Sequence, residues 1–201
     1  MTKLITRLEE EDSRVFNLCR TPVSLQQIDS IKEGFKLNKP AYAVLDTQNN
    51  RAIHLHGANY QLIPYDYILY QLTDALDDYG IDISNTDIKF TLHEDLNYMK
   101  LRILFGDDSM FKPHNMSRDE KDKLRFGIEV ISSYDASLVF TLRAMFVRLI
   151  CANGMTSIED VNSSIKRHTK QFDVDGSFEK LRHLNKTFTN MSDTFEVYSH
   201  T

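Results

Sequence analysis

The most regular helical pattern in the chain is YDYILYQLTDALDDYG, at residues 65–80. Its apolar side chains recur at steps of three and four residues, which places them on one stripe of a helix, and Gly80 follows as a C-terminal cap. The segments on both sides alternate apolar and polar residues instead, as β-strands do. The pattern therefore predicts one central helix between two groups of strands.

The strands before this helix form a predicted hairpin. Apolar runs at 41–45 and 52–55 flank Asn49 and Asn50, and asparagine tolerates the positive φ that tight hairpin turns need. A short edge strand is predicted at 60–64, where the run ends at a proline.

A second hairpin is predicted after the helix, with strands at 88–92 and 99–103. Lys89 alternates with apolar residues in the first strand, and Lys100 and Arg102 do so in the second. Each strand therefore has one apolar and one polar face.

The strand pattern resumes at 124–133 and continues into the least polar stretch of the chain. Residues 137–151 fit both a helical and a strand period; we interpret them as a strand because they are rich in aromatic and β-branched residues and end near Asn153. A helix is the alternative. On a strand, Arg143 and Arg148 lie on opposite faces.

Helices are predicted near both ends of the chain. Ser24 is a candidate N-cap and Gly34 a candidate stop for a short helix between them. Thr156 and Glu159 form a capping-box pattern, and apolar residues at 178–195 follow helical spacing. A helical turn is also expected within a charged surface loop, at 117–123.

These elements predict a single α+β domain over residues 1–201, in which antiparallel β-hairpins pack with a central helix as a β-β-β-α-like core. Its parts are an N-terminal arm or helix, a sheet-and-helix core and C-terminal helices, at 1–38, 41–155 and 156–201. The glycine-rich phosphate-binding motifs of Rossmann enzymes and P-loop NTPases are absent from the sequence.

Composition and cysteine usage indicate a globular protein of a reducing compartment. Hydrophobic residues make up 41% and charged residues 26% of the 201 residues. Cys19 and Cys151 lie far apart and match no metal-binding spacing. The N-terminus carries an acidic run where a secretory signal would be apolar, and no uncharged run reaches membrane-spanning length. We therefore expect a cytoplasmic protein with no membrane segment.

Basic residues gather in one part of an acidic chain. The net charge is -5, yet residues 109–172 hold ten Lys or Arg against seven Asp or Glu, a net of +3 that leaves -8 for the rest. Aromatic residues are interleaved there, and single-stranded nucleic acids bind to positive grooves with aromatic faces for the bases. A solvated surface of mixed charge is the alternative.

The predicted nucleic-acid-binding residues come from this window. Phosphates would meet the basic side chains, and bases would stack on exposed aromatic rings, of which Phe126 and Tyr134 are the candidates. The full set is Lys121, Lys123, Arg125, Phe126, Tyr134, Arg143, Arg148, Lys166, Arg167 and Lys170.

Signals for catalysis or metal binding are weak. Cys151, His168 and Asp135 could form a nucleophilic group, but a single cysteine in an apolar run is typical of an inert core residue. His54 and His56 would share one face of a strand, a spacing also typical of solvated histidines. The sequence therefore predicts no catalytic residue, no metal and no cofactor.

Four stretches resemble a family of uncharacterised phage- and plasmid-encoded proteins with a domain of unknown function. They are HLHGANYQLIPYDYILYQLTDAL, SSYDAS, VRLICANGM and IKRHTKQF. The family pattern falls on Gly57, Tyr60, Ser133, Asp135, Ser137, Arg148, Cys151, Asn153, His168 and Thr169. Ala136 stands where that family has glycine.

The resemblance implies a function through architecture. The β-β-β-α core looks like that of phage single-strand annealing proteins, which implies non-catalytic single-stranded DNA binding and annealing in replication, recombination or repair, by a homo-oligomer. The alternative is a phage accessory protein that binds and modulates a host protein, which the acidic total charge favours. A host or phage replication protein is a further candidate partner.

Overall fold

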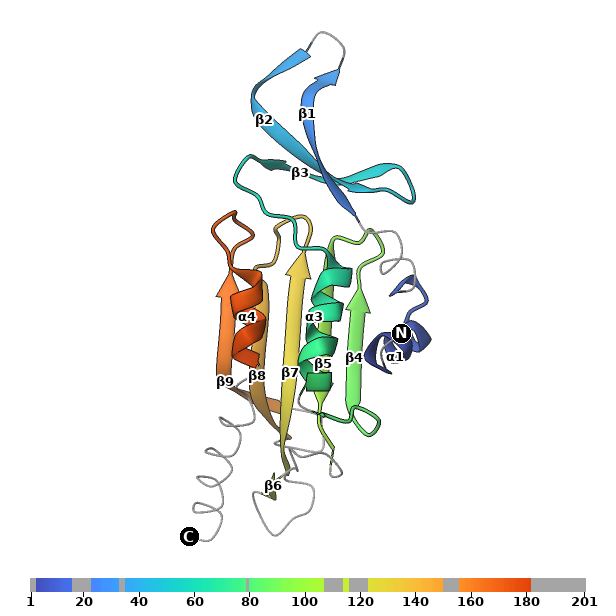
Figure 1. The fold of residues 1–201 in the computed structure, drawn as a ribbon, viewed down its shortest axis with the longest axis vertical. Helices are drawn as coiled ribbons and strands as arrows, with labels where there is room; N and C mark the ends of the chain where they lie inside the picture. Colours follow the sequence, from blue (N-terminus) through green and yellow to red (C-terminus); the bar gives the residue numbers. More distant parts are fainter. Residues whose placement is uncertain are drawn as a thin grey trace.

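The structure is a computed structural model, and it describes residues 3–15, 23–32, 35–78, 80–106, 114–115, 123–149 and 156–181. Within these residues the chain forms two antiparallel sheets and three helices. The smaller sheet has the order β1-β2-β3 and lies beyond one end of the larger sheet (Figure 1). Its strands are β1 (Ser24–Lys32), β2 (Phe35–Asp46) and β3 (Arg51–Gly57).

The larger sheet is an antiparallel meander with the order β4-β5-β7-β8-β9 in the described chain. A two-residue strand, β6 (His114–Asn115), pairs with the start of β7. The main strands are β4 (Asp87–Leu92), β5 (Tyr98–Leu104), β7 (Lys123–Ser133), β8 (Phe140–Leu149) and β9 (Thr156–Lys166).

Two helices, α3 (Tyr65–Asp78) and α4 (Val174–Leu181), cover one face of the larger sheet (Figure 1). The third helix, α1 (Lys3–Glu11), lies beside β4 at the edge of the sheet. Arg14, which follows α1, donates hydrogen bonds to the carbonyl oxygens of Leu92 and His93, at 2.6 and 3.2 Å. These bonds fasten the N-terminal segment to the end of β4.

The core lies between the larger sheet and its helices. The apolar stripe of α3 is buried as its spacing predicts. On the sheet, Phe126 is 1% exposed, and its ring lies 5.9 Å from Phe105 and 5.4 Å from Phe146 between centroids. Burial of side chains of this size contributes about 1.5–3 kcal/mol each, so this face provides the main stability of the fold.

The main predicted elements are confirmed. The fold is α+β, the helix at 65–80 is α3, and the two predicted hairpins are β2–β3 and β4–β5. Asn50 has the positive φ of 50° expected in the first hairpin turn. The strand interpretation of 137–151 is confirmed by β8, and Arg143 and Arg148 lie on opposite faces of it.

Three predicted elements are wrong. The helix between Ser24 and Gly34 is β1, and the helix expected from the Thr156 capping box is β9. In both cases a neighbouring strand supplies backbone partners, ten residue pairs between β8 and β9, and this outweighs a local helix signal. The edge strand at 60–64 is absent from the described residues, where only an isolated bridge joins Tyr60 to Thr169.

Two helix predictions fall partly outside the described residues. Of the segment at 178–195, the structure describes only the end of α4, up to Leu181. Of the helical turn at 117–123, it describes only Lys123, the first residue of β7.

Candidate nucleic-acid interface

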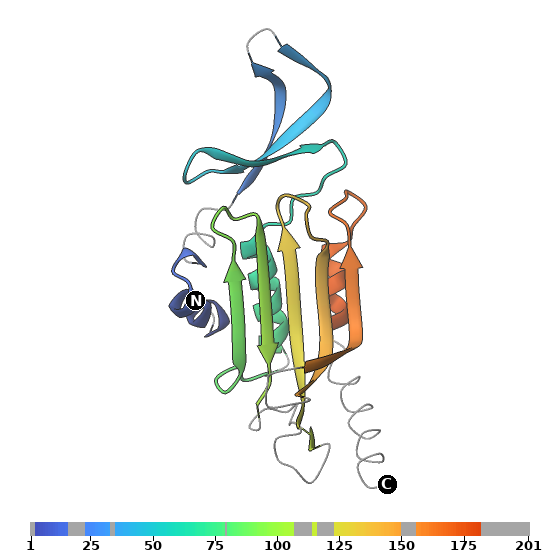
Figure 2. The ribbon, with the colours of Figure 1, turned by 180° about the vertical axis from the view of Figure 1, so that it is seen from behind.

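The two faces of the larger sheet have different surroundings. Ser164 of β9 lies 2.8 Å from Ser177 of α4 between hydroxyl oxygens, so the face that carries Ser164 is the one that the helices cover. Figure 2 shows the sheet from behind, where no described helix or strand lies over it. We call this side the open face; it is exposed only in part, because Met145 and Val147 of β8, which lie on the same side as Arg143, are 0% and 5% exposed.

A row of polar residues crosses the open face from β4 to β9. Its members stand opposite one another in direct register on five strands: Lys89, Arg102, Glu129, Arg143 and Ser163. Adjacent strands are about 4.8 Å apart, so the row from β4 to β8 spans roughly 14 Å. Three of its five residues are cations.

Glu129 joins the two arginines of the row. Arg102 donates to its Oε1 at 2.7 Å, and Arg143 donates to its Oε2 at 2.7 Å. The Glu129 side chain is 7% exposed, while those of Arg102 and Arg143 are 30% and 22% exposed. Charge-assisted bonds of this kind hold both guanidinium groups in fixed positions at the surface, which favours the binding of an anion.

Two more basic residues lie on the open face. Lys100 is exposed on β5, two residues from Arg102 on the same side. Arg125 of β7 donates to the carbonyl oxygens of Phe105 and Leu104, at 3.2 Å each, and its guanidinium lies 3.6 Å from Asp87.

The open face therefore carries more positive than negative charge. Its basic side chains are Lys89, Lys100, Arg102, Arg125 and Arg143. Against these stand Asp87 and Glu129. Among the side chains that the structure describes, five cations against two carboxylates make this face positive on a chain of net charge -5.

An aromatic side chain lies near the end of the open face. Tyr98 of β5 is partly exposed and stands two residues from Lys100, whose ammonium lies 5.2 Å from the centre of the Tyr98 ring. The His93 ring is 5.0 Å from the same ring. A phenol ring beside a cation can stack on a nucleobase.

Some predicted site residues lie on this face and others do not. Arg125 and Arg143 are there. Arg148 lies on the opposite side of β8, opposite Leu124 of β7. Lys123 begins β7, and Lys121 lies outside the described residues, as does Cys151.

The two predicted stacking residues are not available to bases. Phe126 and Tyr134 are each 1% exposed, so the expectation of exposed rings there is wrong. Phe126 belongs to the apolar face of β7. The Tyr134 ring stacks on Tyr65 at 3.8 Å, and its hydroxyl accepts a bond from the Tyr65 backbone N–H at 2.8 Å. Both rings stabilise the core.

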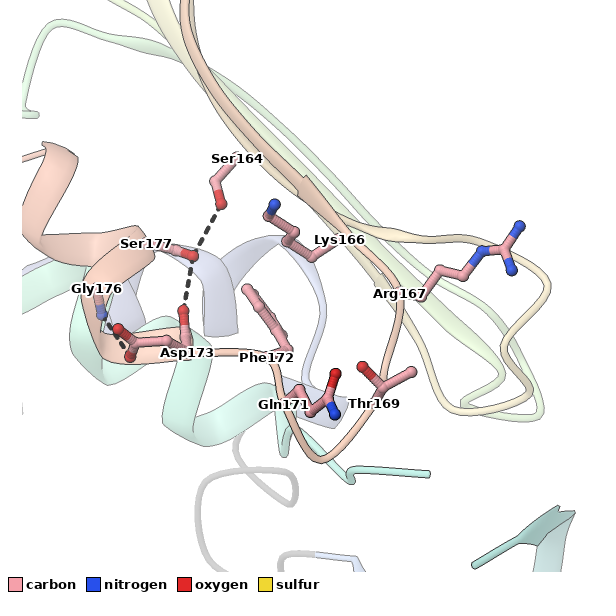
Figure 3. Close-up of a pocket in the computed structure, with 9 residues that line it drawn as sticks. All are labelled: Ser164, Lys166, Arg167, Thr169, Gln171, Phe172, Asp173, Gly176 and Ser177. Carbon is pink, nitrogen blue, oxygen red and sulfur yellow. Dashed lines mark hydrogen bonds between the residues drawn. The ribbon is translucent and has the colours of Figure 1, made fainter. Parts of the chain in front are cut away.

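The remaining predicted residues belong to the end of β9 and the loop after it. Lys166, Arg167 and Lys170 are exposed there. Figure 3 shows Lys166 over a cavity beside α4, while Arg167 points away from that cavity. The Lys170 ammonium lies 5.9 Å from the centre of the Tyr42 ring in the smaller sheet.

Three basic residues of the open face were not predicted as binding residues: Lys89, Lys100 and Arg102. The signal for them was present in the alternation of the second hairpin, which assigned them to polar faces. Only the pairing of β5 with β7 shows that these faces continue into the one that carries Arg143.

Residues of the family pattern meet where the two sheets join. The ring of His56 stacks on Tyr60 at 3.5 Å between centroids, and His168 lies 5.7 Å from Tyr60 on a nearly parallel plane. The hydroxyl of Tyr60 donates to the Tyr134 carbonyl at 3.2 Å. Asp135 accepts a bond from the Ser137 backbone N–H at 2.9 Å in the adjacent turn.

The His168 ring is buried in mostly apolar surroundings. The residue is 6% exposed, and neither ring nitrogen makes a hydrogen bond within the described part of the chain. Burial lowers the pKa of His168 to about 4. The ring is therefore neutral at physiological pH and packs as a flat, mostly apolar group.

The candidates for other chemistry that the structure describes, which do not include Cys151, do not assemble into a site. No group of three or more metal-binding side chains is found among the described residues. His54 lies 4.8 Å from His56 between ring centroids, and the His56 ring nitrogen is engaged by the Tyr134 carbonyl. No helix in the described ranges is long and apolar enough to cross a membrane.

Fold and site together define an α+β protein with an open, positively charged antiparallel sheet. The chain belongs to the family described as Domain of unknown function (DUF932), whose model matches residues 53–201. The expected likeness to a family without assigned function is thereby confirmed, and β1 and β2 precede the matched region. No match was found among curated proteins or among solved structures.

Proposed function

We propose that this protein is a non-catalytic, phage-encoded single-stranded DNA binding and annealing protein that acts in replication, recombination or repair. The observation that carries the proposal is the row of Lys89, Arg102 and Arg143 across an open sheet face. Phosphates supply most of the affinity in sequence-independent binding, and fixed cations on a flat surface suit an extended backbone.

The same surface suits annealing. Among the described residues, Tyr98 is the one partly exposed aromatic ring near the end of the open face, so most bases of a strand held there by its phosphates would point toward solvent. Bases in that orientation can pair with a second strand. A face built to bury bases would need several exposed aromatic rings, and Phe126 and Tyr134 are in the core.

The proposal includes self-association. Strands at sheet edges carry unpaired backbone groups that pair readily with another chain. Of the two edges of the larger sheet, β4 has α1 beside it (Figure 1), so the part of β9 that precedes Ser163 is the edge better suited to a second copy.

Fluorescence anisotropy with a labelled 30-nucleotide oligothymidine tests the binding site. The variant carries Lys89→Ala and Lys100→Ala, because both lysines are exposed and neither supports Glu129. We expect at least tenfold weaker binding at low salt. If each lysine meets one phosphate, the slope of log affinity against log salt falls in magnitude by about 1.4, since each contact contributes about 0.7.

Lys39→Ala is the matched control, an exposed lysine of β2 in the smaller sheet. It should leave both affinity and salt slope unchanged. Absence of binding at low salt, binding that ignores salt, or equal losses in the control would each reject the open face as the site.

A further inference from the structure

A cavity of about 410 Å³ lies between the end of β9 and the first turn of α4 (Figure 3). Lys166 and Ser164 border it from β9, Ser177 borders it from α4, and Phe172 borders it from the loop between them. Its size is within the range of sites for small organic ligands. The lining combines two cations, three hydroxyl groups, one aromatic ring and one carboxylate, the others being Arg167, Thr169 and Asp173.

The charge of Lys166 makes the cavity suited to an anion. Lys166 forms no ion pair within the described chain, and its side chain extends over the cavity (Figure 3). The nearest acidic lining residue, Asp173, is engaged in capping α4, where its Oδ1 accepts the Gly176 backbone N–H at 2.9 Å. The ammonium of Lys166 is therefore available to a phosphate group.

The other lining groups suit the rest of a nucleotide. The Phe172 ring lies 5.1 Å from Phe140 of the core between centroids and borders the cavity; the residue is 9% exposed, so a base can contact only the small part of the ring that the cavity reaches. The hydroxyl groups of Ser164 and Ser177 lie 2.8 Å apart, and Ser177 donates to the Asp173 carbonyl at 3.0 Å, so both are 5% exposed and can only accept a bond from a sugar or base.

The loop that closes the cavity is held in place by the segment before α3. Gln61 donates its backbone N–H to the His168 carbonyl at 3.2 Å, and Lys170 donates to the Asn59 carbonyl at 3.1 Å. Tyr60 and Thr169 form a β-bridge between these bonds. A loop fixed on both sides needs little ordering when a ligand binds, which favours affinity.

The cavity lies directly round the edge strand from the open face. Ser163 ends the row of polar residues on the open face, and Ser164, the next residue of β9, lines the cavity on the other side. A strand that follows the row therefore reaches the cavity by turning round β9. We propose that this cavity holds one nucleotide of the bound single strand, with its phosphate on Lys166 and its base against Phe172.

This inference rests on the proposed function, and isothermal titration calorimetry with thymidine 5′-monophosphate tests it separately. We expect one molecule bound per chain and no binding of thymidine, which lacks the phosphate. Lys166→Met keeps the length of the side chain and removes its charge, so it should weaken binding at least tenfold. Lys170→Met, in the same loop but outside the cavity lining, is the control and should bind as the unmodified protein does.

Absence of nucleotide binding, equal binding of thymidine, or an equal loss in Lys170→Met would overturn the cavity site. If the 30-nucleotide strand still bound with the expected salt slope in that case, the open-face proposal would stand without the cavity. Nucleotide binding by a protein that ignored the 30-nucleotide strand would reject the open face, and with it the path round β9.

Discussion

Two buried ionisable groups, on different sides of the molecule, differ in their hydrogen-bond partners. Glu129, on the open face, and His168, under the loop after β9, are each 6% exposed. Glu129 receives hydrogen bonds from two guanidinium groups, whereas neither ring nitrogen of His168 has a partner among the described residues. One group is buried as an ion with counter-ions, and the other as a neutral ring.

The difference follows from the cost of burying charge. An ionised group without a partner is expensive in an apolar environment, so it either pairs or becomes neutral. On the helix-covered side, apolar groups such as Phe126 pack against the helices. His168, under the loop after β9, is buried in its neutral form. On the open face, the Glu129 carboxylate accepts hydrogen bonds from both Arg102 and Arg143. A charged network at the surface of a sheet is what a phosphate-binding face requires.

The largest expected effect tests the neutral state of His168 by pH. Its folded pKa of about 4 lies below the ordinary value of 6.5, so the unfolded chain takes up a proton first as pH falls. The contribution to stability is complete above pH 6.5 and is lost progressively as pH falls to 4. The difference of about 2.5 units corresponds to about 3 kcal/mol.

The measurement is urea unfolding between pH 7 and pH 4 for the unmodified protein and for His168→Phe, which keeps a flat ring beside Tyr60. Burial also lowers the pKa of His56. His56 and the carboxylates titrate in both proteins, so their contributions to the pH dependence cancel in the comparison. The variant should lose about 3 kcal/mol less than the unmodified protein over this range. Parallel curves would show that His168 is not buried as a neutral ring.

The sequence predicted the apolar faces of the helices and strands better than it predicted the polar site. The stripe of α3 and the alternation in β4 and β5 follow from local periodicity, which needs no knowledge of tertiary contacts. β9 could not be predicted in this way, because pairing with β8 decides its conformation against the capping-box signal at Thr156.

The candidate site was predictable only in part for the same reason. Arg143 was identified from charge, but its neighbours in space, Arg102 and Lys89, come from a different hairpin. Their meeting depends on strand order and register, which one sequence does not contain. Phe126 was misassigned because an aromatic residue near basic ones has the same local pattern whether its ring lies inside or outside.

A smaller effect tests the charged network of the open face. Glu129→Gln keeps the shape of the side chain and removes the charge that two guanidinium groups share. We expect a loss of about 2 kcal/mol in the free energy of unfolding, because charge-assisted hydrogen bonds become ordinary ones. The open face gains one unit of positive charge, so affinity for the 30-nucleotide strand at low salt should rise severalfold.

The expected result for Glu129→Gln is therefore a fall in stability together with a rise in affinity. Glu94→Gln, at an exposed position, is the control for the change of net charge alone. A fall in affinity together with stability would show that the arginine geometry, rather than the charge of the face, controls binding.

The smallest expected effect concerns the turn between β7 and β8, which joins the strands without belonging to either face. Ala136 has a φ of 57°, in the left-handed region that glycine adopts without penalty. Ala136→Gly should therefore raise the free energy of unfolding by about 0.5–1 kcal/mol, or roughly 2–4 °C in Tm.

Ala58→Gly makes the same chemical change in an exposed turn where φ is not positive, and it should lower stability by about 0.5 kcal/mol. Equal shifts in the two variants, measured by thermal unfolding, would mean that the turn at Ala136 carries no backbone strain. A rise in stability only in Ala136→Gly, with binding of the 30-nucleotide strand unchanged, would show that the turn affects the stability of the fold and not binding at the open face.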